Sequence, residues 1–167
     1  MTHLFIFLVQ RTAPIVILCG PEDSLLRASL ITHLSIEDIT FVIFSKEENV
    51  WKWLDSQRTL TIASLIIETT TFNRQIIDHS HNYNNVRSIL IRCTNDNLIN
   101  IQDLSKTYEK VHGVYADDIR VQIKLVIDLA LLSEELGDRS REEENNEVEA
   151  QRHYDRVLKL CDLAEKL

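Results

Sequence analysis

Glycine, proline and cysteine are scarce in this chain. Its 167 residues include three Gly, two Pro and three Cys. Loop-rich all-β proteins need frequent turn residues, so this scarcity favours long regular elements. The cysteines Cys19, Cys93 and Cys161 are odd in number and far apart, which excludes a CxxC redox pair and the ligand spacing of a zinc site. We therefore expect free thiols and a reducing, cytoplasmic location.

A basic surplus and a long apolar run are missing too. There are 18 Lys and Arg against 26 Asp and Glu, a net charge of −8. Binding to nucleic acid or to anionic membrane surfaces needs a basic footprint, so we expect neither partner. No run approaches the roughly 20 apolar residues of a membrane helix. The apolar segment Leu4–Val9 is followed by Arg11 instead of being preceded by basic residues. That order fits an extra strand, or a stub of a removed upstream region, better than a secretory signal.

The chain does contain strand-like runs that alternate with helical patterns. Short apolar runs in such alternation are typical of βαβ units, whose parallel strands are covered on both faces. The sequence therefore predicts an α/β fold with a five-stranded parallel sheet. The five runs are Pro14–Cys19, Ile39–Phe44, Leu60–Ile67, Val86–Ile91 and Val111–Tyr115.

Capping residues mark the expected starts of helices. Asp23 or Ser24 can cap a helix over Leu25–Leu34. Ser45 with Glu48 three residues later has the pattern of a capping box, which predicts a second helix up to about Gln57. Further helices are expected over Asn73–Asp78 and Leu98–Glu109, with a polar connection over His79–Asn85.

Beyond residue 118 the pattern changes to two amphipathic helices. Apolar residues at helical spacing run to Gly137, an acidic stretch follows, and a last apolar helical pattern ends the chain. The acidic run is typical of a solvated loop or helix surface. We expect two domains, an α/β domain over 1–118 and a C-terminal helical hairpin over 119–167.

This hairpin carries more apolar surface than one sheet edge can cover. Exposed apolar patches usually mark interfaces. We expect the hairpin to dock onto a protein partner or an adjacent repeat, or to self-associate. The acidic run Glu142–Glu144 should keep its side of the hairpin free of partners. The candidate interaction residues are Leu129, Leu132 and Leu136 on the first helix, and Tyr154, Val157 and Leu158 on the second.

No catalytic motif is complete. The serines lack a GxSxG elbow, and the turn after Cys19 has a single glycine beside acidic residues, unlike a phosphate loop. We expect a protein that is not an enzyme and has no cofactor. Ligands of parallel sheets bind beyond the carboxyl ends of the strands. The acidic residues Glu22, Asp23 and Glu68 are therefore weak candidate ligands for Mg²⁺; alternatively Asp23 and Asp118 cap helices and Glu68 is solvated.

Five β/α repeats within about 120 residues resemble the receiver domains of chemotaxis response regulators, which have the flavodoxin-like superfold. The resemblance implies the strand order 2-1-3-4-5. It also implies sites for an acidic pair, a phosphoacceptor Asp, a hydroxyl and a Lys at the strand ends. Glutamate is a poor acceptor, and without Lys nothing stabilises an acyl phosphate, so we expect a pseudo-receiver. At those sites stand Glu22 and Asp23, Glu68, Thr94, and Ala116 or Asp117.

Two further stretches carry narrower resemblances. Val86–Cys93 and Tyr108–Tyr115 resemble an uncharacterised family of receiver-like domains from multidomain proteins of bdelloid rotifers, often beside tetratricopeptide or ADP-ribosyltransferase modules. The resemblance implies a part of a larger protein. Leu129–Leu132, Leu136–Asp138 and Ala150–Leu160 resemble one degenerate tetratricopeptide hairpin, for which a plain two-helix extension is the alternative.

The leading hypothesis is a non-catalytic, receiver-like protein-interaction or scaffold module. The alternative is a small-ligand or Mg²⁺-dependent signalling domain that uses the acidic residues at the strand ends.

Overall fold

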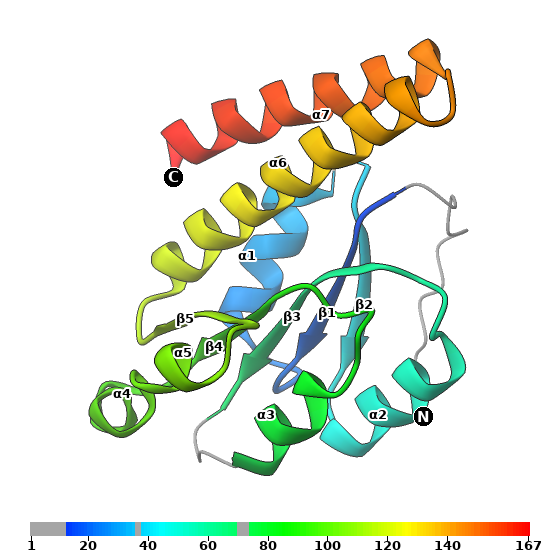
Figure 1. Ribbon diagram of the computed structural model, residues 1–167. Coiled ribbons are helices and arrows are strands. Elements are labelled where there is room, and N and C mark those ends of the chain that lie inside the picture. Colours follow the sequence, from blue (N-terminus) through cyan, green and yellow to red (C-terminus); the bar gives the residue numbers. More distant parts are fainter. Residues whose placement is uncertain (1–12, 36–37, 70–73) are drawn as a thin grey trace.

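Five parallel strands in the order β2-β1-β3-β4-β5 form the centre of the molecule (Figure 1). The computed structural model describes residues 13–35, 38–69 and 74–167; the segment Leu4–Val9, expected as a strand, lies outside them. This strand order is the flavodoxin-like topology and confirms the predicted α/β sheet. The strands are β1 (Ile15–Cys19), β2 (Thr40–Phe44), β3 (Ile62–Glu68), β4 (Ile89–Arg92) and β5 (Val111–Tyr115).

The strand boundaries follow the apolar runs closely. The fifth run matches β5 at both ends. The fourth run differs, because β4 begins at Ile89 while Val86 forms only an isolated bridge with Ile62. Where β4 pairs with β5, the register shifts between Ile89 and Leu90, which an apolar pattern does not reveal.

The helices are α1 (Leu25–Leu34), α2 (Glu47–Ser56), α3 (Arg74–His81), α4 (Asn95–Ile101), α5 (Leu104–Thr107), α6 (Asp118–Glu142) and α7 (Glu147–Lys166). The prediction for α1 is confirmed, and the Ser24 hydroxyl accepts from the backbone N–H of Arg27 at 3.0 Å. The predicted capping box of α2 is wrong. Its N-cap is Lys46, one residue after Ser45, and no side chain caps it.

Three helical stretches differ from prediction. The end of α3 occupies the part of the chain expected as a polar connection, because Ser80 and the following Tyr83 are buried and tie that turn to the core. The expected single helix over 98–109 is broken into α4 and α5. Finally, α6 continues past Gly137 to Glu142. Packing overrode local pattern at each place.

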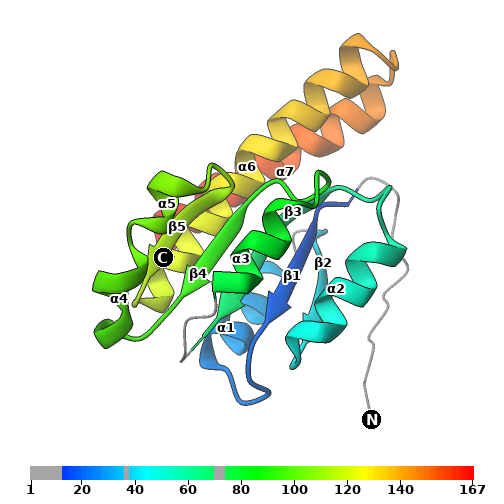
Figure 2. The same cartoon turned by 60° about the horizontal axis from the view of Figure 1, so that its bottom comes forward.

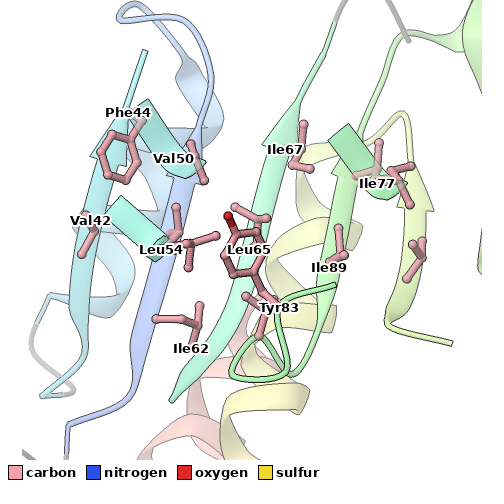
Figure 3. Close-up of a cluster of buried hydrophobic side chains, with 14 of the residues drawn as sticks. Val42, Phe44, Val50, Leu54, Ile62, Leu65, Ile67, Ile77, Tyr83 and Ile89 are labelled. Atoms are coloured by element: carbon pink, nitrogen blue, oxygen red, sulfur yellow. The ribbon is translucent and has the colours of Figure 1, made fainter. Parts of the chain in front are cut away.

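Helices cover both faces of the sheet (Figure 2). On one face, β-strand residues such as Ile17 and Leu65 pack with side chains of α2 and α3, and Figure 3 shows part of this cluster. On the other face, Val16 and Ile66 pack with α1 and α6. Successive strand residues alternate between these two clusters, as the pleat requires.

The helix α6 joins the sheet to the C-terminal helix. Val121, Leu125 and Leu129 belong to the same buried cluster as α1 and the strands. At 1.5 Å per residue the helix is about 37 Å long, so its second half projects beyond the sheet and pairs with α7 (Figures 1 and 2). A Cβ on Gly137 would lie 2.7 Å from the Tyr154 ring, so glycine permits the close approach there. The helix pair is confirmed; the division of the chain at residue 118 stays a prediction.

Candidate functional site

The carboxyl edge of the sheet is the place where the topology predicts a ligand site. Two charged side chains end adjacent strands there, Glu68 on β3 and Arg92 on β4. The Glu68 carboxylate accepts a hydrogen bond from the Ser24 hydroxyl at the start of α1. The Arg92 guanidinium pairs with Asp118 at the start of α6, with 2.7 Å between Nε and Oδ1. Each strand end is therefore tied to the helix that covers that face.

The space beneath the Ser24–Glu68 contact is too small for a ligand. The cavity between β1, α1 and Glu68 measures about 10 Å³, which is no more than one water molecule needs. A Cβ on Gly20 would stand 2.9 Å from Glu68 Oε2, so the turn after β1 lies directly against this carboxylate. Among the described residues, the part of the edge between β1, α1 and Glu68 is therefore filled by its own side chains.

The candidate metal ligands are not gathered at this edge. Glu22 and Asp23 are exposed on the turn before α1, and the Glu22 carbonyl accepts from the Arg27 guanidinium. Glu68 is engaged by Ser24. Across residues 13–35, 38–69 and 74–167, no three His, Cys, Asp or Glu side chains come close enough together to hold a metal ion.

The other receiver-like positions have structural roles. Thr94 is the N-cap residue of α4, although its side chain makes no capping hydrogen bond. Asp117 caps α6 by accepting from the Ile119 N–H at 2.7 Å. The prediction that Asp118 is the cap is wrong, because the chain enters the helix one residue earlier and Asp118 faces Arg92.

The thiols at the strand ends are not activated. Burial raises the pKa of Cys19 to about 11, and nearby Glu47 adds to the shift. Burial also raises the pKa of Cys93, against a smaller opposing effect of Arg92. A nucleophilic cysteine needs a lowered pKa. Cys93 is a buried core side chain, and the partly buried Cys19 packs against the same core.

A stack of three rings where α2 meets α3 was not anticipated from the sequence. The Trp51 ring centroid lies 4.6 Å from that of His79 and 6.0 Å from that of Tyr83, with nearly parallel planes. The Tyr83 hydroxyl donates to Asp55 at 2.8 Å. Burial and this hydrogen bond raise the pKa of Tyr83, so its hydroxyl remains protonated at neutral pH. A polar cavity of about 640 Å³ lies beside the stack, but it holds no activated nucleophile.

A polar cluster on α7 also went unanticipated. Asp38, in the left-handed backbone region at φ 56°, accepts from Arg152 and, at 3.3 Å, from Arg156. The Arg156 side chain is only 3% exposed, and its Nε has no hydrogen-bond partner among the described residues. Arg156 Nη1 lies 2.9 Å from His153 Nδ1. More than a hundred residues separate Asp38 from these arginines, so no local pattern could bring them together.

The His153 side chain should make stability depend on pH. Burial lowers the pKa of His153, and the neighbouring Arg156 lowers it further. Because Arg156 can only donate, Nδ1 of His153 must accept, which requires a neutral ring. As pH falls below about 6.5, the unfolded state takes up the proton first, so the free energy of unfolding decreases.

We expect the thermal midpoint to drop between pH 7 and pH 5.5, about where an unperturbed histidine titrates, with a shallower drop in His153→Gln. Glutamine keeps an acceptor oxygen but does not titrate in this range. Other histidines contribute equally to both proteins and cancel in the difference. Identical pH profiles for the two proteins would contradict this role of His153.

The terminal helices place the predicted interaction residues in different environments. Leu129 and Leu132 are buried against the sheet face, at 0% and 4% exposure. Leu136, Tyr154 and Val157 are half-buried within the helix pair, whereas Leu158 is 69% exposed. Further exposed apolar residues on α6, missing from the predicted set, are Ile119, Ile127 and Leu131.

No helix within the described residues is long and apolar enough to cross a membrane. No family model, curated protein or solved structure matches the chain.

Proposed function

We propose that this chain is a non-catalytic interaction module of receiver-like topology, whose outer α6 face binds another protein in a reducing compartment such as the cytoplasm. The filled space between β1, α1 and Glu68 supports the first half of the proposal. Glu68 and Arg92 are tied to the starts of α1 and α6, and the cavity there has no room for a phosphate or nucleotide.

The exposed apolar side chains of α6 carry the second half. Ile127 and Leu131 are 43% and 60% exposed and lie one helical turn apart. An amphipathic helix that covers a sheet usually turns polar residues to solvent. Apolar side chains grouped on the outer face are typical of a surface that a partner covers.

Site-specific photo-crosslinking tests the interaction. With p-benzoylphenylalanine in place of Leu131, we expect one discrete protein adduct in cells that express the chain, and its loss in Ile127→Glu. The same label in place of Ile99, which is 75% exposed on the opposite face of the sheet, should give no discrete adduct. Equal labelling from both positions, or none from Leu131, would overturn the proposal.

The non-catalytic half has its own test. Incubation with acetyl phosphate and Mg²⁺ should leave the intact mass of the protein unchanged. Mg²⁺ or nucleotides should not raise the thermal midpoint, because a ligand that binds only the folded state would stabilise it by mass action. A phosphoryl adduct on Glu68 or stabilisation by Mg²⁺ would favour the alternative, a ligand-dependent signalling domain.

A further inference from the structure

Five residues on α6 form a symmetric pattern along its outer face. Ile127 stands at the centre, with Ile123 four residues before it and Leu131 four residues after it. Arg120 lies seven residues before the centre and Glu134 seven after. Intervals of three, four, four and three residues keep all five side chains on one helical face. The pattern therefore reads basic, three apolar, acidic.

The two charged ends of this pattern are available for pairing. Arg120 and Glu134 are both exposed, and neither makes an ion pair or side-chain hydrogen bond in the described part of the chain. Neighbouring charges on α6 are already engaged, because Lys124 pairs with Asp128 and Arg139 with Glu135. Arg120 and Glu134 thus bracket the apolar stripe with two charges of opposite sign that are unpaired within the described residues.

We propose that the partner of this face is a second copy of the chain, which packs its α6 antiparallel on the first about a two-fold axis at Ile127. This inference rests on the proposed function and specifies its partner. Antiparallel pairing places Ile127 against its own copy, Ile123 against Leu131, and Arg120 against Glu134. A two-fold interface needs such a self-complementary surface, and opposite charges at its rim fix the direction of the helices.

The dimensions of the stripe suit a weak dimer. From Arg120 to Glu134 the helix rises about 21 Å, so the two copies bury an area at the low end of specific interfaces, where association is weak or transient. The acidic run Glu142–Glu144 begins fifteen residues beyond the axis, whereas α6 of the other copy begins nine residues before it. The acidic run therefore extends past the paired helices and stays in water.

Light scattering coupled to size exclusion measures the assembly directly. Over about 1 to 500 µM, a range that brackets weak protein pairs, we expect a concentration-dependent rise from 19.4 kDa toward twice that mass. Ile127→Glu should weaken the dimer by at least about a hundredfold, because it sets two carboxylates against each other at the centre of the interface. Its thermal midpoint at low concentration should stay unchanged, because Ile127 is 43% exposed and outside the core.

Charge reversal tests the antiparallel geometry. Arg120→Glu and Glu134→Arg should each raise the dissociation constant by about tenfold, since each creates two like-charge contacts per dimer. The double variant restores opposite charges across the two-fold axis and should recover most of the affinity. A dimer in which the double variant is no better than the single ones would overturn this arrangement.

The two proposals fail in different ways. If the crosslinker at position 131 gives a product of twice 19.4 kDa, the result supports the dimer. The dimer is overturned if the chain stays monomeric at every concentration. If the crosslinker at position 131 then still gives a discrete adduct of another mass, and Ile127→Glu abolishes it, the result supports an interaction module with a different partner. A monomeric chain without any such adduct overturns both.

Discussion

Replacing Leu65 by alanine should cost about 2–5 kcal/mol of unfolding free energy, the range for emptying a packed core position. Leu65 is fully buried at the centre of β3, paired with Ile17 of β1 and Ile89 of β4. In Figure 3 it lies in the same buried cluster as Leu54 of α2 and Tyr83. These neighbours belong to several elements, so they cannot all move into the vacated space. Chemical denaturation with urea measures the loss.

Leu25→Ala is the matched control. Leu25 lies at the start of α1 and is 80% exposed, so removing the same atoms there should change stability by less than about 0.5 kcal/mol. An effect below about 1 kcal/mol for Leu65→Ala would contradict a packed position in the centre of the sheet.

Removal of the Asp38 carboxylate should have the second-largest effect. Asp38→Ala leaves the nearly buried Arg156 guanidinium without its counter-ion, and burial already lowers the pKa of Arg156 against the opposing effect of Asp38. Breaking one side of a buried pair costs about 3–5 kcal/mol. Because Asp38 itself is 43% exposed and water can reach the site, we expect a cost below that range, about 2–3 kcal/mol.

A double-mutant cycle isolates this interaction. In an Arg156→Met background no buried charge is left, so Asp38→Ala should cost less than about 1 kcal/mol, the value of its remaining partner Arg152 at the surface. Asp162 lies on α7, as Arg156 does, and its side chain is 75% exposed. Asp162→Ala should therefore leave the free energy of unfolding nearly unchanged. Equal costs of Asp38→Ala in both backgrounds would show that the Asp38–Arg156 pair does not hold α7 to the body.

The sequence by itself determined the sheet and the class of fold. The run Ile15–Leu18 is buried on both faces of the sheet, and full burial requires a continuous apolar stretch that is visible without any structure. The cap of α1 was equally local, because Ser24 and the N–H it accepts from are three residues apart. The strand order came with the receiver resemblance, and the structure confirms it.

Only the tertiary structure decided how the surface is used. Amphipathic spacing predicted more apolar surface on the terminal helices than one sheet edge can cover. In the structure Leu129 and Leu132 are buried, while Ile127 and Leu131 are exposed. The difference depends on how the helix is rotated against the sheet, which long-range packing sets. The Glu68–Ser24 contact and the Asp38–Arg156 pair likewise join residues 44 and 118 positions apart. Local pattern indicates which segments supply apolar side chains, whereas the packing of distant elements decides which of these side chains are buried and what each is buried against.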